Sequence, residues 1–122
     1  MIYQISDIID KEVKVKGAEV LILGFTFKED CPDVRNTKVI DMYLALKSFG
    51  TKVDVYDPLA NEEDVKSEYD IHLTNNLDQK KYNAIVLAVP HKEFISIDID
   101  QFKKDDAVVY DIKNFLNQKD KS

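Results

Sequence analysis

Residues 19–49 read EVLILGFTFKEDCPDVRNTKVIDMYLALKSF, and this stretch decides the fold. It opens with a continuous apolar run, Val20–Leu23, which predicts a strand that is covered on both faces. Gly24 ends the run, and a charged loop follows over residues 25–36. A pattern of helical spacing begins at Thr37. The stretch therefore predicts a buried strand, a charged loop and the start of a helix.

The helix after the loop has clear signals at both ends. Its apolar residues recur at helical spacing, at Val39, Met42, Tyr43, Leu46 and Phe49. Asn36 or Thr37 can accept the first free backbone N–H groups, and Gly50 suits the position after the last turn. A helix N-terminus favours negative charge, and the loop before it carries Lys28 and Arg35. This layout predicts a site for an anion such as a phosphate or a diphosphate.

The rest of the chain continues the alternation of strands and helices. Further strands are predicted over 52–56, 71–74, 84–89 and 107–110. Between them the pattern predicts an acidic helix capped by Asn61, a helical turn or two over 76–82, and short helices from His91 and over 98–104. Such alternation predicts an α/β, Rossmann-like three-layer sandwich with a parallel sheet of about five strands and helices on both faces.

Residues 1–16 lie outside this alternation. Ile2, Ile5, Ile8 and Ile9 recur at helical spacing, so a helix is expected here. Two interpretations remain open: the segment is the tail of an upstream element, or it is a first helix packed on the sheet.

Composition limits the function classes. The net charge of −6 argues against nonspecific nucleic-acid binding, although a small anionic ligand needs only a few well-placed cations. Cys31 is the single cysteine, which excludes an internal disulfide and fits a reducing compartment. No apolar run approaches the ~20 residues that span a membrane, and no signal peptide is visible. A cytoplasmic protein is expected, without nucleic-acid or membrane partners.

Candidate ligand-binding residues follow the predicted strands, because doubly wound sheets bind ligands outside the carboxyl ends of their strands. These residues are Phe27, Lys28, Arg35, Asp57, His91, Asp111 and Lys113. The cations among them converge on the expected switch point, between the first strand and the strand over 84–89. We therefore expect the anion at this crevice.

Several of these residues also have a purely structural interpretation. Arg35 can pair with Asp30 or Asp33 and stiffen the loop. Lys113 can pair with the acidic residue two positions before it. His91 is more often a helix cap or a partner of the backbone than a catalyst. These alternatives remain open at the level of sequence.

Some motifs are missing. The three glycines, Gly17, Gly24 and Gly50, do not form the fingerprint of a dinucleotide site. No Walker A sequence, metal-ligand cluster or nucleophile elbow is present, so no metal is expected. Cys31 has no histidine nearby in sequence and is not expected to be a nucleophile.

Residues 24–37, GFTFKEDCPDVRNT, resemble the signature FKxxxxDxRx(S/T) of the C-terminal domain in the UDP-glucose/GDP-mannose dehydrogenase family. The positions that match are Lys28, Asp33, Arg35 and Thr37. Three weaker matches follow in the family's order: VDVYDP over 53–58, HKEF over 91–94 and YDIKN over 110–114. The resemblance covers about residues 15–116.

The resemblance implies an NAD-dependent enzyme that oxidises the sugar C6 alcohol of a nucleotide sugar to a carboxylate. It implies that Phe27, Lys28 and Lys113 bind the UDP-sugar, with Lys113 at the diphosphate. Arg35 would face the cofactor across the interdomain cleft, and His91 and Asp33 are further candidates.

The resemblance also implies a division into domains. Residues 1–16 would end the helix that connects two domains, and residues 17–122 would form the UDP-binding domain. NAD and the catalytic cysteine would belong to an N-terminal domain, so no catalytic residue and no cofactor are expected in this chain alone. The full enzyme would be a homo-oligomer. DIKN at 111–114, in place of DGRN, resembles members that act on UDP-N-acetylhexosamines rather than UDP-glucose.

Two other function classes fit the alternation. A receiver-type signalling module has the same order of elements, but it needs an acidic pair where this chain has Phe25–Lys28. A pure assembly domain would use the loop cations only for ion pairs. Loss of ligand on removal of Lys28 would separate a binding domain from an assembly domain.

Overall fold

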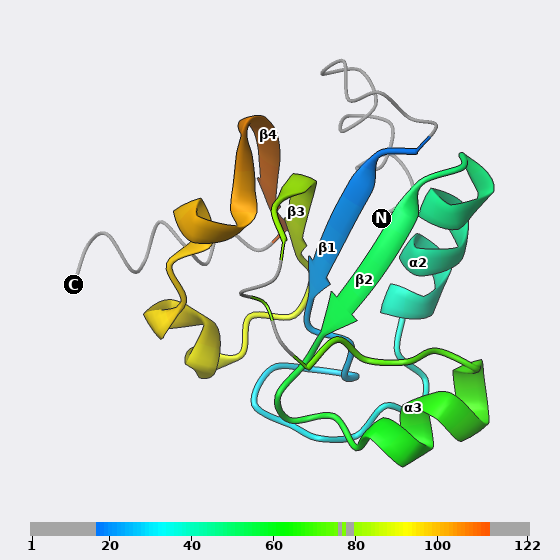
Figure 1. Cartoon of the computed structure of the whole chain (residues 1–122). Helices are drawn as coiled ribbons and strands as arrows, with labels where there is room; N and C mark the ends of the chain where they lie inside the picture. Colours follow the sequence, from blue (N-terminus) through cyan, green and yellow to red (C-terminus); the bar gives the residue numbers. More distant parts are fainter. Residues whose placement is uncertain (1–16, 76, 78–79, 113–122) are drawn as a thin grey trace.

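A computed structural model describes residues 17–75, 77 and 80–112, and within them four parallel strands form one sheet (Figure 1). The strands are β1 (Glu19–Leu23), β2 (Lys52–Tyr56), β3 (Tyr82–Leu87) and β4 (Lys103–Asp111). Their order across the sheet is β2-β1-β3-β4, with every neighbouring pair parallel. The predicted α/β, Rossmann-like class is therefore confirmed.

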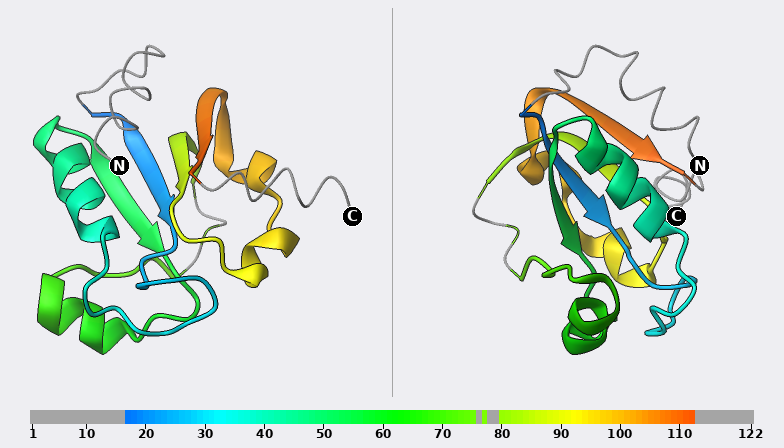
Figure 2. Two further views of the ribbon diagram at one scale, coloured as in Figure 1. Left: turned by 180° about the vertical axis from the view of Figure 1, so that it is seen from behind. Right: turned by 90° about the vertical axis from the view of Figure 1, so that its right-hand side faces the viewer.

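Helical elements cover both faces of the sheet (Figure 2). They are α2 (Val39–Ser48), α3 (Glu62–Tyr69) and two short 3-10 helices, η2 (Lys92–Ser96) and η3 (Ile99–Phe102). In Figure 1, α2 runs alongside β1 and β2, while α3 lies beyond their carboxyl ends. The helices follow β1, β2 and β3 along the chain, as the alternation predicts.

Alternate residues of β1 build two separate cores, because successive side chains of a strand point to opposite faces. Val20 and Ile22 pack in one cluster with buried residues of α2, including Met42. Leu21 packs in the other cluster, with Phe94 of η2 and Phe102 of η3. Burial of each large apolar side chain contributes about 1.5–3 kcal/mol. The central strand is thus held from both sides, which fixes the position of the loop that leaves it.

The ends of the helices lie close to those that the local sequence signals predict, although the N-cap of α2 is Lys38, one residue after Thr37. Thr37 Oγ1 accepts the backbone N–H of Val39 at 3.2 Å, at the start of α2. Gly50, at a φ of 86°, donates its N–H to Lys47 O and closes the other end. Asn61 Oδ1 accepts the N–H of Asp64 and caps α3.

Three predicted boundaries need correction. Residues 71–74 form no strand: Ile71 is buried like a strand residue, yet the segment adds only one backbone bond to the sheet, from Thr74 N–H to Val55 O. The helix predicted over 98–104 is the shorter η3, and β4 starts at Lys103, earlier than predicted. The turn predicted over 76–82 lies partly outside the described residues, as residues 1–16 do entirely.

Candidate functional site

The switch point of the sheet lies between β1 and β3. The chain leaves β1 toward β2 by way of α2, and it leaves β3 toward β4 by way of η2 and η3. A pocket of about 160 Å³ opens here, lined by residues 26–29, 37–39 and 88–90. It therefore lies between the exits of both central strands and the start of α2, which is where the sequence places the ligand.

Two predicted ligand residues lie at this pocket. Phe27 is 55% exposed, although it is a large apolar side chain, and Lys28 beside it is exposed as well. Lys38, at the N-terminus of α2, adds a second exposed cation that the sequence reasoning missed. Its position one residue before the helix was the signal that could have indicated it. An exposed ring, two cations and the positive end of a helix dipole suit a planar base and a phosphate.

Behind the pocket, a buried polar network joins the exits of three strands. The carboxylate of Asp57, after β2, accepts the N–H groups of Phe25 and Thr26, after β1, at 2.6 and 3.2 Å. Nε2 of His91, after β3, lies 2.9 Å from the same oxygen and 3.1 Å from Thr26 Oγ1. The side chains of Asp57 and His91 have no exposed surface. The sequence placed them at strand ends but did not indicate that they meet.

The Asp57 carboxylate is held in its charged form. Burial raises its pKa, but the hydrogen bonds from His91 and from the N–H of Phe25 lower the pKa by more. The pKa of Asp57 therefore lies below its usual value. The second oxygen accepts the N–H groups of Leu59 and Ala60 at 2.8 and 3.1 Å. A carboxylate with this many donors is a rigid anchor for the three loops.

Gly24 brings the exits of β1 and β3 into close contact. Its φ is +95°, and a Cβ there would lie 2.6 Å from Val89 Cβ and 2.8 Å from Val89 N. The space at this glycine is therefore filled by the neighbouring loop.

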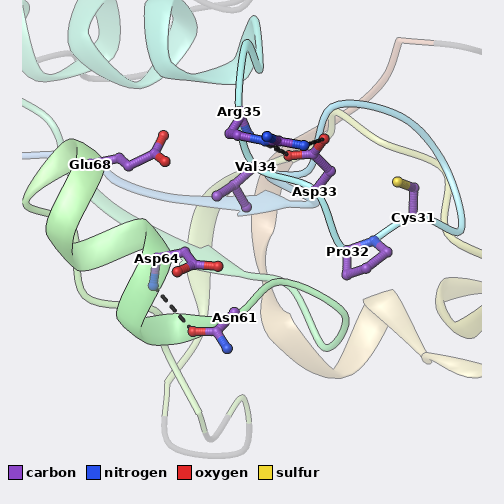
Figure 3. A pocket seen from close by; sticks show the side chains of 8 residues that line it. All are labelled: Cys31, Pro32, Asp33, Val34, Arg35, Asn61, Asp64 and Glu68. Atoms are coloured by element: carbon purple, nitrogen blue, oxygen red, sulfur yellow. Dashed lines mark hydrogen bonds and ion pairs between the residues drawn. The ribbon is translucent and has the colours of Figure 1, made fainter.

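Arg35 points away from this pocket. Its Nε lies 3.1 Å from Asp33 Oδ1, with three-quarters of its side chain exposed, which confirms the predicted pairing with Asp33. The pair lines an open hollow of about 600 Å³ together with Asp64 and Glu68 of α3 (Figure 3). The hollow is larger than the switch-point pocket, and three of its eight lining residues are acidic: Asp33, Asp64 and Glu68.

His91 and Lys113 are the remaining residues of the predicted site. His91 is buried and does not reach the pocket surface. Lys113 lies outside the described residues. In the sequence it comes two positions after Asp111, the last residue of β4. Among the described residues, no group of three or more His, Cys, Asp or Glu side chains is arranged to hold a metal ion. Within the same residues, no helix has the length and apolar character to cross a membrane.

Fold and pocket together define a Rossmann-like domain with a candidate ligand site at the switch point. The family model described as "UDP-glucose/GDP-mannose dehydrogenase family, UDP binding domain" matches residues 21–118. The chain belongs to this family.

Similar proteins include two curated UDP-N-acetyl-D-glucosamine 6-dehydrogenases. The one from Salmonella typhi is 44% identical over 115 residues, and the one from Pseudomonas aeruginosa is 41% identical over 115 residues. Each match covers 92% of this chain but only 27% of the relative. The fold is also shared with the UDP-N-acetyl-mannosamine dehydrogenase of Staphylococcus aureus, at a TM-score of 0.73 and 21% identity, covering 94% of this chain and 27% of that one.

Proposed function

We propose that this chain is the UDP-sugar-binding domain of an NAD-dependent UDP-sugar 6-dehydrogenase. The observation that carries the proposal is the exposed pair Phe27 and Lys28 at the switch-point pocket of a UDP-binding family member. The names of the two curated relatives favour a UDP-N-acetylhexosamine as the substrate, ahead of UDP-glucose. The product is the corresponding uronic acid, used in polysaccharide biosynthesis.

Each candidate residue has a role in this proposal. Lys28 and the N-terminus of α2 attract the diphosphate, Phe27 contacts the nucleotide sugar, and Lys113 supplies a further cation. Arg35, exposed on the far side of the same loop, faces the cofactor domain. His91 and Asp33 shape the loop rather than contact the ligand.

The rest of the enzyme lies outside this chain in the proposal. An N-terminal domain holds NAD and the catalytic cysteine, residues 1–16 lead to it, and the full protein assembles as a homo-oligomer in the cytoplasm. The partly exposed Cys31 has no part in the reaction, so the chain alone oxidises nothing.

Titration of the 122-residue chain with UDP tests the proposal. We expect amide resonances of residues 26–29 and 37–39 to shift at millimolar UDP, with weak affinity because the enclosing domain is absent. Lys28→Ala should weaken binding about tenfold, the loss of one charge-assisted contact. Lys52→Ala is the matched control, since Lys52 is also exposed but lies at the amino end of β2, away from the pocket.

The outcomes separate the function classes. Binding that Lys28→Ala removes and Lys52→Ala leaves intact supports a UDP site. No shift at residues 26–29 at millimolar UDP contradicts it and leaves the assembly domain as the better interpretation. Uptake of phosphate from a small phosphodonor with magnesium would instead indicate the receiver-type module.

A further inference from the structure

His91 joins the two walls of the switch-point pocket. Its backbone follows β3, directly after Pro90, which lines one wall. Its ring contacts the other wall, because Nδ1 accepts the backbone N–H of Asp30 at 2.9 Å. Asp30 returns the contact, since its Oδ1 accepts the N–H of Lys92 at 2.9 Å. Two hydrogen bonds thus fix the loop after β1 to the loop after β3.

The partners of the ring determine its protonation state. A backbone N–H can only donate, so Nδ1 must carry a lone pair. The remaining ring proton is therefore on Nε2, where the Asp57 carboxylate accepts it at 2.9 Å. A second proton, on Nδ1, would face the N–H of Asp30 and break that bond. The hydrogen bonds thus fit the tautomer that carries its proton on Nε2 and a lone pair on Nδ1.

These bonds hold the backbone on both sides of Lys28. Thr26 Oγ1 lies 3.1 Å from His91 Nε2 and donates to Lys28 O at 2.9 Å. Asp30 N–H, two residues after Lys28, is held by Nδ1. Asp30 adopts a left-handed φ of 58°, which is uncommon in residues with a side chain, and the bond from its N–H to Nδ1 holds this conformation. The ring is thus placed to fix the backbone from which Lys28 projects.

We propose that His91 is a positioning residue for ligand binding, which fixes the Lys28 backbone through the hydrogen bond between Nδ1 and the N–H of Asp30. The inference rests on the proposed function of the pocket and assigns a role to a residue that never touches the ligand. Of the two ring nitrogens, Nδ1 serves the pocket through its bond to Asp30, whereas Nε2, which contacts Asp57 and Thr26, chiefly serves the stability of the fold.

Two substitutions separate these contacts. In His91→Asn the amide oxygen stands near the place of Nδ1 and can accept the N–H of Asp30. In His91→Gln the amide nitrogen stands near the place of Nε2 and can donate to Asp57. Both lose the ring packed on Phe94 at a centroid distance of 5.4 Å, so both lose stability for the same reason. His72→Asn, at the exposed second histidine, is the matched control.

Affinity for UDP is then compared in the 122-residue chain at a temperature where all variants are folded. We expect His91→Gln to weaken binding about tenfold, the effect of one lost hydrogen bond, and His91→Asn to stay close to the unsubstituted chain. His72→Asn should bind unchanged. Equal affinity in the Asn and Gln variants, or stronger binding by the Gln variant, would overturn the proposal.

A second measurement needs no ligand, so it separates a failure of the positioning role from a failure of the UDP site. Ring nitrogen shifts of His91 should show a proton on Nε2 alone, and the amide of Asp30 should exchange slowly with solvent. A protonated Nδ1, or an Asp30 amide that exchanges as fast as an exposed one, would overturn the positioning role even if UDP binds. If both signatures are present and the unsubstituted chain ignores UDP, the proposed function fails while the contact between the loops stands.

Discussion

The two ends of the sheet carry polar networks of similar size in opposite surroundings. At the carboxyl end, the side chains of Asp57 and His91 are 0% exposed. At the amino end, Lys80 Nζ lies 2.9 Å from both Glu19 and Asp54, and these three side chains are 28–40% exposed. Both networks join strands, but only the buried one lies behind the candidate pocket.

The difference shows that burial, more than the number of ion pairs, decides what a network does. Water competes for every partner of Lys80, so its exposed pairs contribute little to stability. No water replaces the donors of Asp57, so each lost contact there leaves an uncompensated buried group. We expect the carboxyl end to tolerate little change and the amino end to tolerate much.

The largest effect should come from Asp57→Ala. The substitution leaves the backbone N–H groups of Phe25 and Thr26 without an acceptor and His91 without its charged partner. We expect the free energy of unfolding, measured by chemical denaturation, to fall by about 3–5 kcal/mol, because each buried donor left without an acceptor costs about 1–3 kcal/mol. Glu19→Gln at the amino end, which removes the ion pair with Lys80, should cost less than about 1 kcal/mol. Equal losses in the two variants would contradict the comparison.

Gly24→Ala should be next in size. The new Cβ would overlap Val89 at a φ of +95°, and we expect a loss of about 2–4 kcal/mol from overpacking and strain together. Gly17 is the matched control at the amino end, because its φ is +83° but nothing lies within 4 Å of a Cβ there. Gly17→Ala should therefore cost only about 1 kcal/mol. Thermal unfolding of both variants measures the difference, and a Gly17→Ala loss as large as that of Gly24→Ala would refute the packing argument.

An effect of intermediate size is expected in the pH dependence of stability, because the Asp57 carboxylate is buried and charged. The folded pKa of Asp57 lies below its ordinary value of 3.8, since His91 and the N–H of Phe25 outweigh the effect of burial. Its contribution to stability is therefore complete above about pH 4 and is lost as the pH falls through the lower folded pKa. In Asp57→Asn the free energy of unfolding should fall less steeply between about pH 4 and pH 2 than in the unsubstituted chain. The free energy of unfolding is measured by urea titration at each pH. If it falls equally steeply with pH in both chains, Asp57 is not responsible for the acid sensitivity.

The smallest effect should come from Lys80→Met. Its two ion pairs raise the pKa of Lys80 and lower that of Glu19, but all three groups reach solvent. We expect a loss below about 1 kcal/mol that shrinks further in 1 M salt, where exposed charges are screened. A loss that persists in high salt would mean that the amino-end network is as important as the buried one.

The sequence predicted the strands that a continuous apolar run marks within a single segment of the chain. The apolar runs at 20–24 and 84–89 appear as the central strands, because a covered strand needs apolar residues on both faces. It mispredicted 71–74, since Ile71 and Leu73 are buried but the backbone is scarcely paired. It also missed the start of β4, because Lys103 and Lys104 lie in a charged run that resembles a helix or loop.

For the site, the sequence predicted positions but not contacts. Phe27 and Lys28 follow β1, so the topology alone takes them to the switch point. The meeting of Thr26, Asp57 and His91 depends on how three strands align, which no local pattern contains. The burial of such polar residues is a tertiary property. Their sequence positions predicted only that they lie at the carboxyl end of the sheet.

The parallel arrangement of β1 beside β3 has a consequence for the kinetics of folding. The bond from Glu19 N–H to Asn83 Oδ1 joins residues 64 positions apart. The strands β1 and β3 can therefore pair only after the whole chain between them has been synthesised. Contacts so distant in sequence slow folding, because the entropy of loop closure precedes the gain from pairing. The pocket between these strands therefore depends on a slow, long-range pairing, and a chain in which β1 and β3 are not yet paired lacks it.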